Sequence, residues 1–217
     1  MKKLQAIYFH DFNNSYIPHI LKEVYIDQIY RPFVQGKKDL TIVDLGANIG
    51  LTSFYFKDYA KQIYAVEPAK EHIECIDAMI KQNDIKNIEV CPYAISAESG
   101  TAKFYHNDNV TMFSLKSEVN KQDDYEEVQT LTMTDFMKKY KIKDIDILKF
   151  DIEGSEGELI TSEGFIKASK HIKVILGEWH TWSSMNPNMF ANTLRDLGYQ
   201  FDWTNKSYAS TFTAIKK

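Results

Sequence analysis

The stretch TIVDLGANIGLTSFYF, residues 41–56, constrains the fold of this chain more than any other stretch. A β-branched run ends at Asp44, a turn containing Gly46 and Gly50 follows, and an apolar-periodic segment begins at Ile49. A short buried strand that passes through a glycine turn into a helix is the repeating unit of a parallel sheet covered by helices. The stretch therefore predicts an α/β fold with a ligand at the carboxyl end of the first strand.

The rest of the chain repeats this alternation of strand and helix. We expect strands at 42–45, 63–66, 88–93, 145–150 and 171–178, and helices at 17–30, 49–59, 71–82, 135–140, 158–168 and 188–197. Thr134 is expected to cap the helix at 135–140. The runs YQFDWT and STFTAI close the chain as an antiparallel pair. Short alternating pieces between residues 101 and 133 predict an inserted hairpin with a mobile tip.

Composition indicates one domain over residues 1–217, with 1–39 as an N-terminal cover and 40–217 as a Rossmann-like core that carries the insertion. Hydrophobic residues make up 44% of the chain, and the formal net charge is −4. The lysines are scattered, so a small-molecule partner is expected rather than nucleic acid or a membrane. Cys75 and Cys91 lack CxxC spacing and no secretion signal is evident, which predicts a cytoplasmic protein with reduced thiols, either monomer or homodimer.

The turn after the first strand differs from a dinucleotide-binding loop. Its spacing is G-x-N-x-G, with Asn48 where the G-x-G-x-x-G fingerprint has its middle glycine. Asp44 would repel a phosphate but attract an ammonium or sulfonium group. Glu67 ends the second strand, where a carboxylate accepts both ribose hydroxyls. These features point to S-adenosylmethionine, whereas a purely structural turn is the alternative reading. The predicted cofactor residues are Asp44, Gly46, Ala47, Asn48, Gly50, Glu67, Pro68, Ala94 and Asp151, with Ser96 beside Ala94 on the adenine side.

Four motifs resemble the FkbM family of methyltransferases: VDLGANIG, AVEP, YAIS followed by Gly100, and ILKFDIEGSEGELI. The resemblance covers roughly residues 40–180. It implies a class I methyltransferase fold, a Rossmann-like three-layer sandwich with a mostly parallel seven-stranded sheet and an antiparallel C-terminal strand pair. It also implies S-adenosylmethionine as the methyl donor and O-methylation of sugars or hydroxylated metabolites. Neither the insertion nor EWHTWSSMNPNMF carries a substrate signature, so the sequence leaves the acceptor open.

The candidate catalytic residues follow the fourth and fifth of the predicted strands. Asp151 ends one strand, with Glu153 two residues later, and Glu178 and His180 end the other. Asp151 and His180 are the predicted acid/base pair, with a neutral imidazole taking the acceptor's proton beside Glu178. Two alternatives stay open: the acidic residues only shape the turn, or Asp151, Glu178 and His180 hold a divalent cation. The nearby aromatic residues Trp179, Trp182 and Trp203 either stack on a substrate or pack in the core.

Three other functions compete with methyl transfer to a small molecule. The first is a methyltransferase with the same cofactor that acts on RNA or protein. The net negative charge of the chain disfavours it. The second is a nicotinamide-dependent oxidoreductase, which the missing G-x-G-x-x-G disfavours. The third is a non-catalytic module that retains the cofactor pocket.

Overall fold

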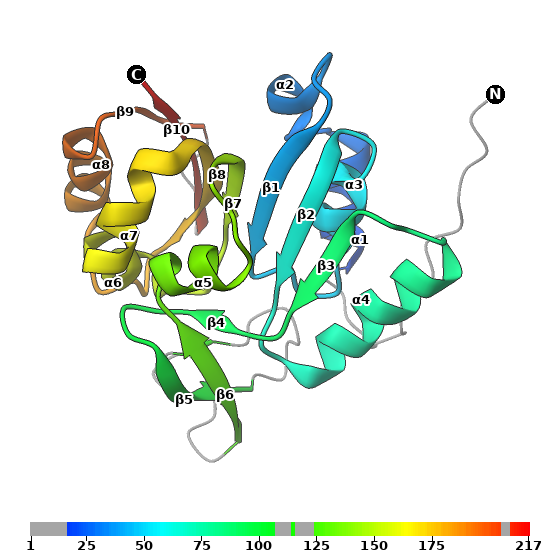
Figure 1. Cartoon of the computed structure of the whole chain (residues 1–217). Helices are drawn as coiled ribbons and strands as arrows, with labels where there is room; N and C mark the ends of the chain where they lie inside the picture. Colours follow the sequence, from blue (N-terminus) through cyan, green and yellow to red (C-terminus); the bar gives the residue numbers. More distant parts are fainter. Residues whose placement is uncertain (1–16, 107–113, 116–123, 205–208) are drawn as a thin grey trace.

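The computed structural model describes residues 17–106, 114–115, 124–204 and 209–217. It contains a seven-stranded sheet with the order β3-β2-β1-β7-β8-β10-β9 (Figure 1). The strands are β1 (Leu40–Leu45), β2 (Ala60–Val66), β3 (Ile88–Cys91), β7 (Ile145–Phe150), β8 (Ile172–His180), β9 (Tyr199–Trp203) and β10 (Ala209–Lys216). All neighbouring pairs run parallel up to β8, and β10 is antiparallel to both β8 and β9. The predicted mostly parallel sheet with an antiparallel C-terminal pair is confirmed.

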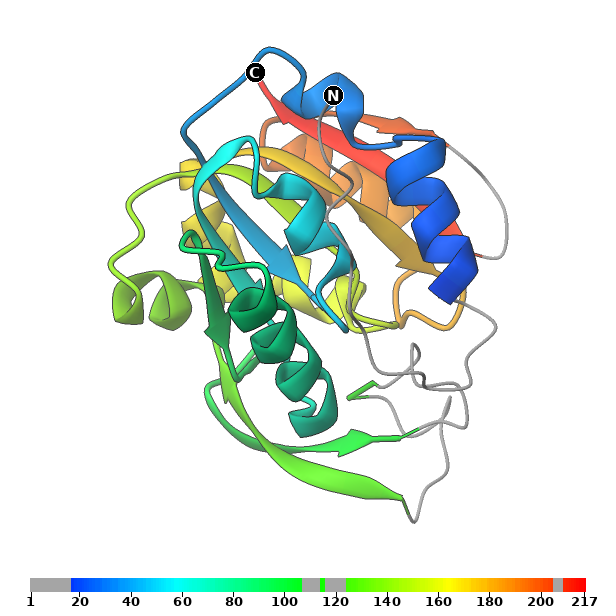
Figure 2. The same cartoon turned by 90° about the vertical axis from the view of Figure 1, so that its right-hand side faces the viewer.

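Helices cover both faces of the sheet and make it the middle of three layers (Figures 1 and 2). One face carries α5 (Met133–Lys139), α6 (Glu156–Thr161), α7 (Glu163–Ala168) and α8 (Pro187–Asp196). The other carries α1 (Ile17–Leu21), α2 (Arg31–Val34), α3 (Leu51–Phe56) and α4 (Lys70–Gln82). Each face has its own apolar core: Phe136 and Phe165 belong to the first, and Phe56 and Ile76 to the second. Burial of these side chains is the main force that holds the layers together.

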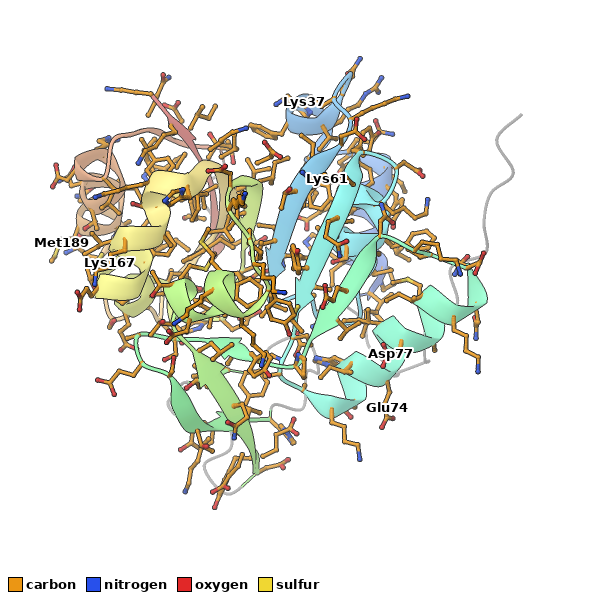
Figure 3. The ribbon with its side chains drawn as sticks, viewed as in Figure 1. Lys37, Lys61, Glu74, Asp77, Lys167 and Met189 are labelled. Atoms are coloured by element: carbon orange, nitrogen blue, oxygen red, sulfur yellow. The ribbon has the colours of Figure 1, made fainter. Side chains whose placement is uncertain are left out.

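Helix α4 illustrates how the sequence pattern selects a helix. Its buried residues His72, Cys75, Ile76 and Met79 recur at the three- and four-residue spacing of one helical face. Glu74 and Asp77 are exposed on the opposite side (Figure 3). Within the described part of the chain, no helix has the length and apolarity needed to cross a membrane.

The insertion and the segment just before it form a second, three-stranded sheet from β4 (Ala94–Ile95), β5 (Gly100–Tyr105) and β6 (Tyr125–Leu131). β5 and β6 are antiparallel, so the predicted hairpin is confirmed, and β4 adds a parallel pairing that the sequence did not predict. The predicted mobile tip lies largely outside the described residues. This small sheet hangs below the carboxyl ends of the main strands in Figure 1, on the side where a ligand is expected.

Several element boundaries differ from those predicted. Thr132, and not Thr134, caps α5, because its Oγ1 accepts a hydrogen bond from the backbone N–H of Asp135. The helix predicted at 158–168 is divided at Ser162, whose extended backbone ends α6 while its side chain caps α7. The N-terminal helix predicted at 17–30 is α1 followed by a π-helical turn, Lys22–Ile26. Caps and breaks depend on single side chains, which periodicity does not register.

Candidate functional site

A cavity of about 360 Å³ lies at the carboxyl ends of β1, β2, β7 and β8. Parallel strands end at one edge of a sheet, so residues that follow separate strands meet there. The lining includes Gly46, Ala47, Asn48, Glu67, Pro68, Ala94, Asp151, Glu153, Glu178, His180 and Trp182. The N-terminal segment also contributes, through Ile20, Glu23 and Tyr30. The structure thus brings most of the predicted cofactor residues and all of the predicted catalytic residues to one cavity.

The turn after β1 requires glycine at position 46. Gly46 has a φ of 71°, and a Cβ built there would lie 1.8 Å from the carbonyl oxygen of Asp151. The backbone N–H groups of Gly46 and Ala47 both donate to the carbonyl of Val66 at 3.0 Å. Asn48 also has a left-handed backbone, with a φ of 51°. The turn therefore passes directly beside the ends of β2 and β7, an approach that any side chain at position 46 would block.

Glu67 fixes the turn after β1 to the turn after β2. Its Oε2 accepts a hydrogen bond from the N–H of Asn48 at 2.8 Å, and its Oε1 accepts one from the N–H of Ala69 at 3.0 Å. The Nδ1 of His72 lies 3.2 Å from the same Oε1. Glu67 is only 4% exposed but lines the cavity. The sequence predicted a ribose acceptor; the structure adds that this carboxylate is held in place by backbone donors and by His72, which sequence reasoning missed.

Asp44 does not face the cavity, contrary to the prediction that it attracts a cofactor ammonium group directly. It is fully buried, accepts a hydrogen bond from Ser53 Oγ at 2.6 Å and lies 3.4 Å from Lys149 Nζ. Burial raises the pKa of Asp44, although Lys149 and Ser53 oppose this. Two more predicted residues, Gly50 and Ser96, also lie outside the lining. Gly50 has a left-handed backbone and packs against Ile76 and Met79 of α4.

Lys149 connects the two halves of the site. It is 5% exposed, and its Nζ donates to the carbonyl oxygen of Gly46 at 2.7 Å. The same Nζ lies 3.4 Å from carboxylate oxygens of both Asp44 and Asp151. These two carboxylates raise the pKa of Lys149 against the lowering effect of burial, so the ammonium stays charged. Sequence reasoning missed Lys149, although a lysine inside the apolar strand ILKF was a signal for it.

The turn after β7 presents its acidic residues to the cavity through an unusual backbone. Glu153 has a φ of 50° and Gly154 a φ of 98°. A Cβ at Gly154 would lie 2.4 Å from Trp182 Cδ1, so the indole packs directly on the turn. The hydroxyl of Ser114, from the insertion, donates to the Glu153 carbonyl at 2.5 Å. The turn is therefore shaped by contacts from two other parts of the chain.

His180 lies at the end of β8, surrounded by carboxylates. Its Nδ1 is 2.7 Å from Glu156 Oε1, and both residues are buried. Its Nε2 lies 3.5 Å from Glu153 Oε2, and 3.8 Å from oxygens of both Asp151 and Glu178. The structure therefore gathers the predicted trio of Asp151, Glu178 and His180, and adds Glu153 at close range. Glu156 was missed, although the second carboxylate of the EGSE segment was visible in the sequence.

The carboxylates change the protonation expected for His180. Burial acts to lower the pKa of His180, but the hydrogen bond to Glu156 and the charges of Glu156 and Glu153 outweigh it and raise that pKa to about 10. Burial is also the main cause that raises the pKa of Glu153 to about 8 and that of Glu178 to about 7. The sequence predicted a neutral imidazole near pH 7; the charged surroundings favour an imidazolium instead.

The three tryptophans have different surroundings. Trp182 lines the cavity, with its ring centroid 4.7 Å from that of His180. Trp179 and Trp203 lie 6.3 Å apart between centroids, and Trp203 also packs near Phe212. Only Trp182 is therefore positioned to contact a ligand, while Trp179 and Trp203 belong to the core region.

Comparison with known protein families gives one match over most of the chain. The model of the FkbM methyltransferase domain matches residues 44–201. This range begins at the end of β1 and ends in β9, so it includes the cavity residues that follow β1, β2, β7 and β8 but not those of the N-terminal segment. A comparison with curated proteins finds no match.

Solved structures of methyltransferases share the fold. An FkbM methyltransferase from Methylobacillus flagellatus KT superposes with a TM-score of 0.59 at 16% identity, covering 82% of this chain and 44% of that one. Magnesium protoporphyrin IX methyltransferase from Synechocystis PCC 6803 was solved with bound S-adenosylmethionine. It superposes with a TM-score of 0.56 at 10% identity, covering 92% of this chain and 82% of that one. Precorrin-6y C5,15-methyltransferase from Geobacter metallireducens GS-15 gives 0.52 at 15% identity, covering 88% of each chain. The architecture is that of the class I methyltransferases.

Proposed function

This chain belongs to the FkbM family of S-adenosylmethionine-dependent methyltransferases, and we propose that it transfers the methyl group to a hydroxyl of a small molecule, a sugar or a glycosylated metabolite. The main observation behind this proposal is that two sets of residues line the same cavity. The turn at Gly46 and Glu67 forms the donor end, and the cluster around His180 forms the acceptor end. The carbonyl of Asp151 touches Gly46, so the two ends adjoin.

The acceptor end favours a polyhydroxylated molecule that carries no phosphate near its reacting group. Asp151, Glu153 and Glu178 all line it, and carboxylates accept hydrogen bonds from hydroxyl groups but repel phosphate. The flat indole of Trp182 offers a surface for an apolar sugar face beside them. A cavity of about 360 Å³ is in the size range of small-molecule sites. Phosphate-rich RNA is disfavoured as an acceptor by the same carboxylates.

Methyl transfer to oxygen requires alignment and removal of one proton. The acceptor oxygen forms a bond to the methyl carbon, the electron pair of the carbon–sulfur bond stays on sulfur, and S-adenosylhomocysteine leaves. Glu153 receives the hydroxyl proton in our proposal. His180 is less suited, because Glu156 engages its Nδ1 and three carboxylates surround its Nε2. Its role is to hold these carboxylates in position.

A methyl-transfer assay tests this function. The full chain is incubated with S-adenosylmethionine labelled in its methyl group, with and without added divalent cations. The acceptor panel pairs sugars and glycosides with analogues in which single hydroxyls are replaced by hydrogen. Transfer to a parent sugar that disappears when one particular hydroxyl is removed is the expected result. Transfer only to RNA or protein would overturn the proposal.

Binding of S-adenosylhomocysteine, measured by calorimetry with NADH as the control, tests the donor end separately. Binding of the first ligand alone is expected from the turn at Gly46 and from Glu67. A protein that binds S-adenosylhomocysteine but methylates no acceptor would point to the non-catalytic module instead.

A further inference from the structure

We propose that Asp151, Glu178 and His180 bind a divalent transition-metal cation, of the Mn²⁺ class, at the acceptor end of the cavity. Each residue offers one ligand atom, and these atoms lie within 4.8 Å of one another. The three side chains come from the carboxyl ends of the adjacent strands β7 and β8. This inference deepens the proposed function and rests on it for the identity of the acceptor, but cation binding can be measured without any acceptor.

The contact between His180 and Glu156 resembles the usual arrangement around a metal-binding histidine. A histidine that binds a metal through one nitrogen usually donates its other ring N–H to a carboxylate, which fixes the ring. His180 has this arrangement, since its Nδ1 is 2.7 Å from Glu156 Oε1. Glu156 is fully buried, and the N–H of Gly154 holds the same oxygen at 2.8 Å. Nε2 is thereby directed at Asp151 and Glu178.

The space around Nε2 of His180 also suits a cation. Its shortest contact with a carboxylate oxygen is 3.5 Å, to Glu153, which is longer than a normal hydrogen bond. His180 is only 3% exposed. The Oδ1 atom of Asp151 is buried and has no hydrogen-bond partner in the described part of the chain. Partly buried carboxylates around a common space, with one imidazole nitrogen directed into it, form the arrangement expected of a cation site.

Local charge supports the same conclusion. Lys149 is the ammonium group nearest to Asp151, and it is also engaged by Asp44 and by the Gly46 carbonyl. Glu153 and Glu178 have no such lysine partner among the described ion pairs. A divalent cation would place two positive charges among these carboxylates and relieve their mutual repulsion.

The ligand chemistry selects the type of cation. One imidazole with two carboxylates suits Mn²⁺, Fe²⁺ or Co²⁺ better than Ca²⁺, which takes oxygen ligands. Three protein ligands leave coordination positions for an acceptor hydroxyl on the cavity side. A hydroxyl bound there loses its proton more readily, and Glu153, which is outside the ligand set, receives it as the oxygen takes the methyl group. In this arrangement Asp151, Glu178 and His180 bind the cation, and Glu153 accepts the proton.

Calorimetric titration of the chelator-treated full chain with MnCl₂ tests the site. Wild type is expected to bind one Mn²⁺, and Glu178→Gln and Asp151→Asn are expected to weaken binding about 10-fold to 100-fold or abolish it. Glu156→Gln, which alters only the positioning partner of His180, is expected to weaken it by about 10-fold. Glu74→Gln is the matched control, because Glu74 is exposed on the far side of α4 (Figure 3) and should leave binding unchanged.

A spectroscopic measurement of metal binding complements calorimetry, and a separate measurement checks that each variant is folded. Co²⁺ bound through His180 should give visible absorption bands that His180→Gln loses, while binding of S-adenosylhomocysteine confirms that each variant is folded. Absence of Mn²⁺ and Co²⁺ binding in wild type, or binding that Glu178→Gln and His180→Gln leave unchanged, would overturn the cation site. Cation binding without turnover of any hydroxyl acceptor would support the site and count against the proposed function.

Discussion

The two ends of the cavity differ in how their charged groups are paired. At the donor end, Glu67 accepts two backbone N–H groups and lies beside His72, and Asp44 is bonded to Ser53 and paired with Lys149. At the acceptor end, three carboxylates lie around one nitrogen of His180 at 3.5 to 3.8 Å. The donor end is thus organised by hydrogen bonds within the protein, whereas the acceptor end gathers three carboxyl groups around a single imidazole nitrogen.

This difference follows from what each end has to do. The donor end receives the same cofactor in every turnover, so a rigid, internally bonded pocket avoids reorganisation on binding. In the proposed transfer to a hydroxyl, the acceptor end takes up a proton and orients the hydroxyl, and groups left without full pairing are available for those tasks. The following experiments test whether the two ends respond differently, in order of expected effect.

Gly46→Ala should damage both ends at once and have the largest effect. The added Cβ would lie 1.8 Å from the Asp151 carbonyl, and the φ of 71° disfavours any side chain. We expect loss of S-adenosylhomocysteine binding and a destabilisation of at least about 3 kcal/mol, measured by calorimetry and chemical unfolding. Gly36→Ala is the control, because Gly36 has a φ of 77° but open space around it and should cost only about 1 kcal/mol. If both variants lowered the free energy of unfolding equally, the close approach of Gly46 to Asp151 would be unimportant for stability.

Glu153→Gln should affect only the acceptor end. If Glu153 receives the proton, transfer should slow by about 100-fold or more while S-adenosylhomocysteine affinity stays near that of wild type. Single-turnover transfer and calorimetry measure the two quantities. Glu163→Gln, at an exposed position at the start of α7, is the control and should be neutral. A normal rate in Glu153→Gln would exclude it as the proton acceptor.

Glu67→Ala should affect mainly the donor end. It removes a carboxylate that lines the cavity and holds the N–H groups of Asn48 and Ala69. We expect S-adenosylhomocysteine binding to weaken by roughly 1.5 to 3 kcal/mol, with a smaller change in the transfer rate at saturating cofactor. An unchanged affinity would remove Glu67 from the cofactor site and show that its contacts are structural alone.

The smallest expected effect concerns Cys91, at the end of β3. Burial raises the pKa of Cys91 to about 12, so its thiol stays protonated and unreactive well above neutral pH. In a Cys75→Ala variant, alkylation by iodoacetamide should therefore accelerate little between pH 7 and pH 9. The same variant in urea should show the usual acceleration toward pH 8.5. Fast alkylation of the folded variant at pH 9 would mean that the end of β3 opens more than the burial of Cys91 suggests.

Much of the fold was predictable because its cause is local periodicity. The β-branched runs at β1, β2 and β7 and the amphipathic spacing of α4 specify which segments are buried, whatever their partners. Motif spacing similarly indicated the turn at Gly46 and the residues after β7 and β8. The division of the helix predicted at 158–168 was missed, since it depends on one capping side chain, Ser162.

The sequence by itself determined the strands of the sheet, the glycine turn after β1 and the set of acidic residues at the edge of the sheet. Only the tertiary structure decided how those residues pair. Lys149 donates to the Gly46 carbonyl across 103 positions and lies beside the buried Asp44, and Glu156 contacts His180 across 24 positions and orients the imidazole. Burial and charge act over a few ångströms in space rather than along the chain, so partners and pKa values emerge only when distant strands end side by side.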